Sequence, residues 1–419
     1  MNKIKPLGKY ANSFQAFLVL IVIYINTVPI FVQFIPVNFV WLVSMVLWFV
    51  FVFLNRPNFF LKLPTPLVAM SLFSIYTIVI PYLFGNPIIT NRYIGLAQIP
   101  FFYFAFIFNE SSGNMRTNYS IIKWSILPIV FIAITTLLIL IKNPYASRQA
   151  TSLRSEFSSD YIFTGGYDFI YSLAIFTVIL FAIYFLHSRY SNSKFQKIQL
   201  FILLVLFLIT VFLSNFLTAV LMILFSISFF YVIKNNLFSL MFIIPILIIL
   251  IIIFNQELIS LLIDMFDLIS PQGKIVDKLI DLQMKSSVFG NQNIMSDRNE
   301  TYLSSFNGFL ENPIFGKVIY PFSVEDNFFS GFGQHSQIID TMSLFGIFGI
   351  IQIYFLLKIF TIRLKKGFRS LNAFTLSVML SVLILNFFNN STALCGFAYF
   401  FVYPSVYHLF NNKMALNIK

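Results

Sequence analysis

Long apolar runs separated by short polar breaks fill most of the 419-residue chain. A run of ~17–25 apolar residues is long enough to cross a bilayer as an α-helix. On this criterion the pattern predicts twelve membrane spans, at residues 14–35, 37–54, 66–84, 93–108, 124–141, 168–186, 198–214, 216–233, 237–254, 338–357, 371–388 and 397–410. Backbone polar groups inside a bilayer need partners within the chain, so each span is predicted to be a helix. The sequence therefore predicts an all-α polytopic membrane protein.

One predicted connection is much longer than the others. Residues 255–337 form a loop of 83 residues between the ninth and tenth spans, whereas loops beyond ~12–15 residues are uncommon. This loop divides the chain into residues 1–254 with spans 1–9, the loop itself, and residues 338–419 with spans 10–12. The loop at 142–167 is the next longest on the same side. We expect function to reside where these two loops meet the membrane.

The composition agrees with a membrane protein. Hydrophobic residues make up 58% of the chain and charged residues 10%, whereas soluble domains are ~25% charged. So few charges cannot cover a water-facing surface, which excludes a soluble enzyme or a nucleic-acid-binding module. The single cysteine, Cys395, excludes a disulfide scaffold. Phenylalanine, with 56 residues, suits helices that face lipid.

The basic residues indicate the orientation of the spans. With the N-terminus inside, 18 of the 27 Lys and Arg residues fall on the cytoplasmic side, and only one of the 15 acidic residues, Glu110, does so. This bias follows the positive-inside rule and predicts twelve spans with both termini cytoplasmic. It also accounts for the net charge of +12 without nucleic acid as a partner. The first span, which lacks a small-residue cleavage site, is expected to be an uncleaved anchor.

The large loop contains three predicted helices. Residues 257–269 and 274–285 each place apolar residues on one face and acidic or basic residues on the others. Such helices either lie in the membrane interface or pack against their neighbours. The third helix follows Asp297, which with Glu300 makes a capping box, and it ends before Pro313.

Arg298 lies in the first turn of this third predicted helix. A guanidinium beside a helix N-terminus attracts anions, and its planar shape matches two phosphate oxygens at once. Arg298 is therefore a candidate phosphate-binding residue. The alternatives are that it pairs with Asp297 or Glu300, or that it contacts lipid headgroups.

The loop ends in GQHSQIIDTMSLFGIFG, which leads into the tenth span. His335 is the only histidine predicted on the outer side, and a histidine accepts protons near neutral pH. Asp340 falls within an apolar helix, where ionisable groups are costly and usually functional. Ser336 and Asp340 lie one turn apart on a helix, but His335 and Asp340 do not share a face. Gly346 and Gly349 are expected to allow close helix packing.

Further candidates lie in the shorter outer loops. Arg148 and Arg154 precede Tyr167, which stands at the start of the sixth span, and Arg92 precedes the fourth span. The arginines either bind a diphosphate or anchor the chain among lipid headgroups. The sequence contains no Walker loop, no dinucleotide-binding glycine motif, no HExxH and no Cys/His cluster, so we expect no cofactor and no metal site.

Three segments carry a resemblance to a known family: GGYDFIY at 165–171, RNETYLSSFNGFLENPIFGK at 298–317 and GQHSQIIDTMSLFGIFG at 333–349. With about twelve spans and a late outer loop, the chain resembles the bacterial O-antigen and capsular polysaccharide polymerases, the Wzy family. The resemblance implies a GT-C-like fold in the bacterial inner membrane with a large helical periplasmic loop. The related O-antigen ligases share this plan.

The resemblance also implies an activity, that of a metal-independent membrane glycosyltransferase. A growing glycan would leave its undecaprenyl-diphosphate carrier and join the non-reducing end of a lipid-linked repeat unit, so that lipid-linked oligosaccharides are both donor and acceptor. Arg298 and Arg154 would contact the diphosphate, with Arg148 and Arg92 as further candidates. His335 would act as a base or contact the leaving group, and Tyr167 and Asp340 would line or orient the site. Membrane lipid and a protein that regulates chain length would be the partners.

Three other functions remain open. A ligase would perform the same chemistry on a lipid A-core acceptor. A flippase for lipid-linked oligosaccharides also has about twelve spans, but transporters often place ionisable groups in the bundle and repeat their halves. A scaffold for envelope proteins would leave the outer Arg and His residues unexplained.

Overall fold

The computed structural model describes residues 8–85, 94–152, 162–190, 193–235, 263–264, 276, 280, 296–320, 336–390 and 392–417. All regular structure in these residues is helical. The elements in chain order are α1 (Lys9–Thr27), α2 (Phe31–Phe34), α3 (Val37–Asn55), η1 (Pro57–Lys62), α4 (Thr65–Leu83), η2 (Ile94–Ala97), α6 (Gln98–Ser111), α7 (Met115–Lys142), α8 (Ala146–Ser152), α9 (Tyr167–Tyr190), α10 (Lys194–Leu213), α11 (Leu217–Asn235), α15 (Ser296–Glu311), η4 (Lys317–Ile319), α17 (Gln337–Thr361), α18 (Arg369–Phe388), α19 (Ala393–Phe397), the π-helical turn η5 (Ala398–Val402) and α20 (Tyr403–Asn417).

Within the described residues, ten helical segments are long and apolar enough to cross a membrane. They coincide with ten of the twelve predicted spans, which confirms a polytopic helical membrane protein. The predicted span at 93–108 corresponds to η2 and α6, and α6 has only 14 residues, fewer than a perpendicular crossing requires. The predicted span at 237–254 lies outside the described residues, as do most of the two predicted loop helices at 257–269 and 274–285.

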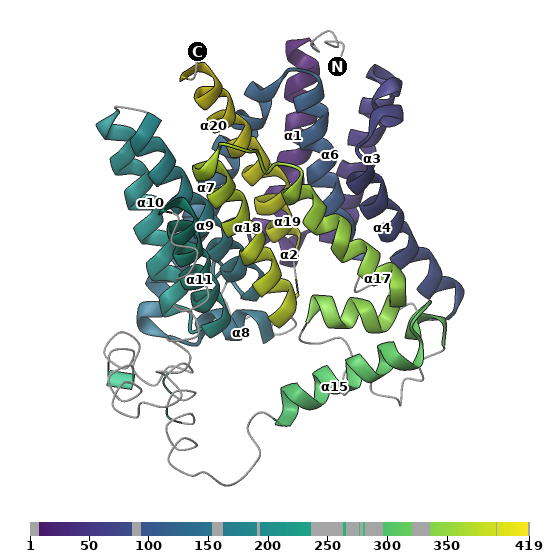
Figure 1. Cartoon of the computed structure of the whole chain (residues 1–419). Helices are drawn as coiled ribbons and strands as arrows, with labels where there is room; N and C mark the ends of the chain where they lie inside the picture. The colour runs from purple at the N-terminus through teal and green to yellow at the C-terminus, as the bar shows by residue number, and fades with distance from the viewer. Residues whose placement is uncertain are drawn as a thin grey trace.

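The spans form one bundle with two distinct ends (Figure 1). α1 begins and α20 ends at the same end, which we call the terminal face. α8 and α15 lie at the opposite end, which we call the distal face, and α15 runs across the bundle rather than along it. A chain that crosses a membrane an even number of times has both of its ends on the same side of that membrane. The distal face corresponds to the side of the two long predicted loops.

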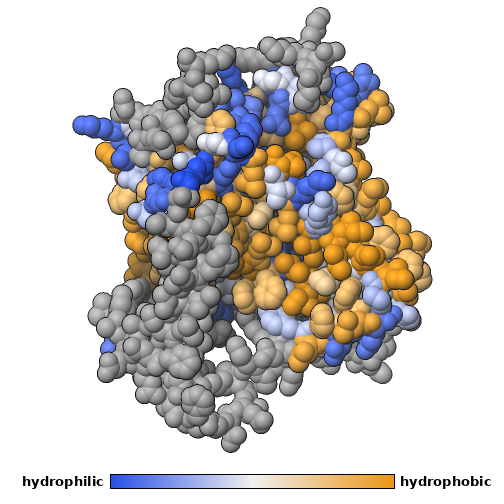
Figure 2. Space-filling view, viewed as in Figure 1, coloured by the Kyte–Doolittle hydropathy of each residue, from blue (hydrophilic) through white to orange (hydrophobic). Residues whose placement is uncertain are grey.

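The outer helices present apolar side chains to their surroundings. Only 28% of the α3 span and 22% of the α10 span is buried inside the protein. Figure 2 shows a belt of hydrophobic side chains over the middle of the right-hand side of the visible face, with hydrophilic ones above it towards the terminal face and others below it. A belt of this kind is the surface that a bilayer would cover.

The centre of the bundle consists of α6, α9 and the last span. The share of buried residues is 78% for the α9 span and 83% for Ala393–Asn412. α6 is packed with phenylalanine, and its buried rings include Phe101 and Phe108, which meet Trp48 edge to face at 5.5 and 5.7 Å. In α6 the phenylalanine rings therefore fill the core of the bundle and do not face lipid.

A buried chain of amides joins three helices near the terminal face. The Gln15 side chain on α1 donates to Asn109 Oδ1 on α6 at 2.7 Å, and Asn109 donates to Asn118 Oδ1 on α7 at 2.6 Å. Gln15 Oε1 also accepts a bond from the indole N–H of Trp48 at 3.3 Å. In the apolar interior of the bundle, such bonds satisfy the buried amides and fix how the helices pack against one another.

α17 is broken, whereas the sequence predicted a continuous span at 338–357. Gly346 has φ 57° and ψ −136°, which interrupts the helix. Beyond the break the chain folds back, so that a Cβ on Gly349 would lie 2.3 Å from the backbone oxygen of Thr341. In an unbroken helix these two residues would be ~12 Å apart along the axis. The first part of α17 lies across the distal face beside α15, and the second part runs into the bundle (Figure 1).

The break is held by the turn that follows α15. This helix ends at Glu311, as the position of Pro313 predicted. The backbone N–H of Ile347 donates to the Pro313 oxygen at 2.8 Å, and Gly316, with φ 74°, packs against the backbone of Leu344. The close packing that was predicted for Gly346 is thus confirmed, but its partner is a turn, not a second helix.

Candidate functional site

Asp340 is a buried carboxylate at the distal face, only 1% exposed. Its Oδ1 accepts a hydrogen bond from Ser305 Oγ of α15 at 3.1 Å, and its Oδ2 accepts one from the backbone N–H of Ser336 at 3.3 Å. The prediction that Ser336 and Asp340 lie one turn apart is confirmed. A buried carboxylate is costly unless it is hydrogen-bonded, so these contacts fix α15 against the first turn of α17.

The same turn is joined to two further helices. Ser336 Oγ accepts from the Ile339 N–H at 3.2 Å and caps α17. The Gln337 N–H donates to the Asn389 oxygen, just beyond the end of α18, at 3.2 Å. The Asn389 side chain in turn donates to the Tyr171 hydroxyl on α9 at 2.9 Å. Ser305, Ser336, Asp340, Asn389 and Tyr171 thus form one connected set, which we call the distal polar cluster.

Tyr167 and Arg148 lie beside this cluster. The ring of Tyr167 is 4.7 Å from that of Tyr171 and 5.9 Å from that of Phe216. The Arg148 guanidinium lies 4.6 Å from the same Phe216 ring and donates to the backbone oxygen of Asn215 at 2.7 Å. The structure therefore brings these two predicted site residues to one aromatic ring. Arg148 ties α8 to the start of α11, and its contact with a diphosphate stays a prediction.

The structure describes the other predicted site residues only in part. Arg298 lies in the first turn of α15, as predicted, although its side chain is outside the described part of the chain. It precedes Ser305 by two helical turns on the same stripe of α15. His335, Arg154 and Arg92 lie outside the described residues. His335 directly precedes Ser336, the cap of α17.

The three segments that carry the family resemblance meet at the distal face. The bonds from Ser305 to Asp340 and from Ile347 to Pro313 join the segments 298–317 and 333–349. Asn389 then links the segment 333–349 to Tyr171 in the segment 165–171. The segment 165–171, which is more than a hundred residues from the other two in the sequence, therefore meets them around the distal polar cluster.

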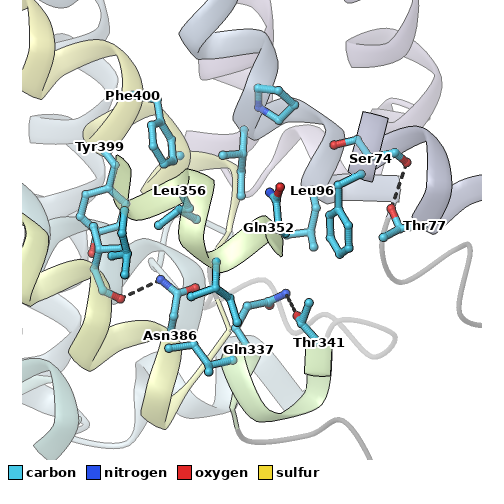
Figure 3. A pocket seen from close by; sticks show the side chains of 18 of the residues that line it. Ser74, Thr77, Leu96, Gln337, Thr341, Gln352, Leu356, Asn386, Tyr399 and Phe400 are labelled. Atoms are coloured by element: carbon cyan, nitrogen blue, oxygen red, sulfur yellow. Dashed lines mark hydrogen bonds between the residues drawn. The ribbon is translucent and has the colours of Figure 1, made fainter. Parts of the chain in front are cut away.

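A cavity extends from this cluster into the bundle (Figure 3). It lies between α4, η2, α6, α17, α18, α19 and η5. Gln337, Thr341 and Asn386 line its distal end, and Leu356, Leu357 and Phe400 line its deeper walls. Gln352 lies between Leu96 and Leu356 in the close-up.

Some residues of the cluster were not predicted. Ser305, Tyr171 and Asn389 are neutral residues in or beside apolar segments, where a serine, a tyrosine or an asparagine carries no distinctive signal. Only Asp340 stood out, because a charge in an apolar helix is rare. In the part of the chain that the structure describes, no group of three His, Cys, Asp or Glu side chains is placed to hold a metal ion.

No protein-family model matches the chain, and no curated protein is significantly similar to it. These comparisons therefore provide no relative from which to assign this site. The arrangement at the distal face, together with the sequence motifs, is the basis for a functional proposal.

Proposed function

We propose that this protein polymerises lipid-linked oligosaccharide repeat units of an O-antigen or capsule. It transfers the growing glycan from an undecaprenyl-diphosphate donor to the non-reducing end of a lipid-linked repeat unit. The proposal places the protein in the bacterial inner membrane with both termini in the cytoplasm, so that the distal face is the periplasmic one.

The observation that carries the proposal is the meeting of the three motif segments. A buried hydrogen bond from Ser305 to Asp340 and a backbone bond from Ile347 to Pro313 join two of them. The third reaches the same point through Tyr171. This convergence at the mouth of a cavity supports a single site for a membrane-bound substrate.

The chemistry is a substitution at the anomeric carbon of the donor sugar. An acceptor hydroxyl attacks this carbon and forms a new C–O bond. The C–O bond to the diphosphate breaks, and the diphosphate leaves with the electron pair and its developing negative charge. The hydroxyl proton passes to a base. Cationic groups at the diphosphate and a base at the acceptor lower the barrier to this reaction.

The proposal assigns these roles to residues around the distal polar cluster. Arg298 and Arg154 stabilise the leaving diphosphate, and Arg148 and Arg92 are further candidates. His335 receives the proton of the acceptor hydroxyl, or else contacts the leaving group. Since Asp340 is buried among internal partners, its proposed role is to orient the segment that bears His335, not to touch substrate.

A gene-deletion strain tests the proposal. It is complemented with the wild type, Arg298→Ala or His335→Ala, and surface glycans are resolved by gel electrophoresis alongside the membrane abundance of each variant. Arg369→Ala, an exposed arginine at the start of α18 on the terminal face, and His187→Ala, near the end of α9 on that face, are the matched controls. We expect a single repeat unit in the deletion strain and in both site variants, and a full ladder in both controls.

Other outcomes would reject the proposal in different ways. Carrier-linked long chains that never reach the lipid A-core would identify a ligase. Repeat units trapped on the cytoplasmic side would identify a flippase. A full ladder in both site variants would reject the assigned residues.

A further inference from the structure

The helix α15 presents three different sides to its surroundings. Ser305 is buried against the first part of α17, to which it is bonded through Asp340. Glu311 lies on a second, exposed and polar side. Leu303, Phe306 and Leu310 recur at helical spacing on the third side, where they are 60%, 45% and 58% exposed. A helix with one side on protein, one in water and one exposed apolar side is suited to the boundary between lipid and water.

The apolar side of α15 continues into the turn that follows it and then onto α17. Ile314 and Phe315 in this turn are exposed as well. The Phe315 ring stacks on the ring of Phe348 at 6.2 Å, and Phe348 lies on the outer surface of the second part of α17 together with the exposed Ile351. The second part of α17 runs along the bundle (Figure 1) and belongs to a candidate membrane span. The exposed apolar surface of α15 is therefore continuous with a surface that faces the bilayer.

The turn after α15 also lies at a depth that the bilayer would cover. The Tyr76 hydroxyl oxygen is 3.5 Å from the backbone oxygen of Phe315, and Tyr76 is only ~16 Å along α4 from the end of that helix at the terminal face. Ile347, which is bonded to the Pro313 oxygen, is only ~21 Å along α17 from the end of that helix at the terminal face. The hydrocarbon core of a bilayer is ~30 Å thick. Both helices thus place the turn inside the core, ~10 Å from its distal boundary.

The backbone of the turn is organised as this depth requires. Non-helical backbone inside a membrane needs hydrogen-bond partners within the protein. The Gly316 N–H donates to the Asn312 oxygen at 2.9 Å, and the Pro313 oxygen accepts from the Ile347 N–H at 2.8 Å. The inner side of the turn is also covered, because Val318 is buried against side chains of α4. Polar backbone is thus paired within the protein, and apolar side chains are on the outside.

We propose that the apolar side of α15 and its turn is embedded in the lipid leaflet on the distal side, with acyl chains against Leu303, Phe306, Leu310, Ile314 and Phe315. Lipid is favoured over a second copy of the chain because the surface joins the apolar belt and lies at membrane depth. Glu311 is bonded to Lys317 at 2.6 Å, so the two charges are paired at the level of the headgroups. The distal polar cluster then lies at the membrane surface, not in a domain above it.

The test uses full-length protein in nanodiscs with a fluorophore attached to Phe306→Cys. Glu311→Cys is the matched control, because residue 311 is ~140° around the same helix from residue 306. Ile351→Cys provides the lipid-facing reference. Wild type provides the background, since its single cysteine, Cys395, is buried. We expect a spin label near the top of the acyl chains to quench the fluorophore at residues 306 and 351 several-fold more than at residue 311. Aqueous iodide should quench in the reverse order.

Two results would overturn the proposal. Equal quenching by iodide at residues 306 and 311 would show that both sides of α15 are in water. Protection of residue 306 from both quenchers would show that protein covers it, as in contact with a second copy of the chain. If Phe306→Cys is not recovered as folded protein, Leu310→Cys reports on the same side of α15.

This inference stands apart from the proposed function. Strong quenching by lipid at residue 306 in a preparation that elongates no glycan would support the embedded helix and reject the polymerase. Glycan elongation with residue 306 open to iodide would reject the embedded helix and leave the polymerase in place.

Discussion

Replacing Gly346 with alanine tests whether the break in α17 organises the distal face. Gly346 has φ 57°, a backbone conformation that costs a non-glycine residue about 1–3 kcal/mol. The added Cβ would lie 2.5 Å from the Ile314 oxygen and 2.6 Å from the Pro313 oxygen, so the turn after α15 would have to move. Overpacking of this kind costs about 1–3 kcal/mol, and the lost bond from Ile347 to Pro313 costs about 1 kcal/mol.

Together these contributions predict that Gly346→Ala lowers the free energy of unfolding by about 3–7 kcal/mol. Two other glycines separate the causes. Gly367 has φ +87° but no atom within 4 Å of an added Cβ, so Gly367→Ala should lose only about 1 kcal/mol. Gly95 has open space and no positive φ, so Gly95→Ala should change the free energy by less than ~0.5 kcal/mol.

The assay is reversible unfolding in mixed micelles with increasing SDS, followed by the fluorescence of the three tryptophans. The expected order of loss is Gly346→Ala, then Gly367→Ala, then Gly95→Ala. A Gly346→Ala variant no less stable than Gly367→Ala would refute the reasoning, because the contact with the turn would then contribute nothing.

Three further substitutions test buried polar contacts in the same unfolding assay. Asp340→Ala leaves the Ser305 hydroxyl without its acceptor and should lose about 1–3 kcal/mol, whereas Asp340→Asn keeps one acceptor oxygen and should lose less; equal losses would argue against the bond. Gln15→Leu leaves Asn109 without its donor and should lower the free energy of unfolding by about 2 kcal/mol. An unchanged midpoint of the unfolding transition would rule out a stabilising role for the amide chain. Arg148→Lys keeps the charge but loses the planar contact with an aromatic ring, so we expect a loss of about 1 kcal/mol; no loss would show that charge alone suffices there.

Most of the membrane-spanning architecture could be predicted from the sequence, because a bilayer imposes length and hydropathy on each span. Ten predicted spans coincide with long apolar helices. Hydropathy does not reveal a break inside a span, and so the sequence could not reveal the turn at Gly346. That break depends on a contact with Pro313 and Ile314, which belong to a different segment of the chain.

The candidate site was predicted less completely. Asp340 was recognisable as an ionisable group in an apolar helix, yet its partner Ser305 lies on an amphipathic helix where serine is ordinary. Arg148 was selected for its charge, and the structure shows that the same guanidinium packs on Phe216. Charge in a sequence shows where an interaction is needed, but the partner is determined by the tertiary fold.

Reconstituted polymerisation tests the central proposal most directly. Purified protein in liposomes would be supplied with undecaprenyl-diphosphate-linked repeat units alone, and the products would be separated by length and weighed by mass spectrometry. The proposal predicts carrier-linked products that differ by one repeat unit, no ladder with Arg298→Ala, and an unchanged ladder with Arg369→Ala. Unaltered single repeat units with folded wild-type protein would contradict it.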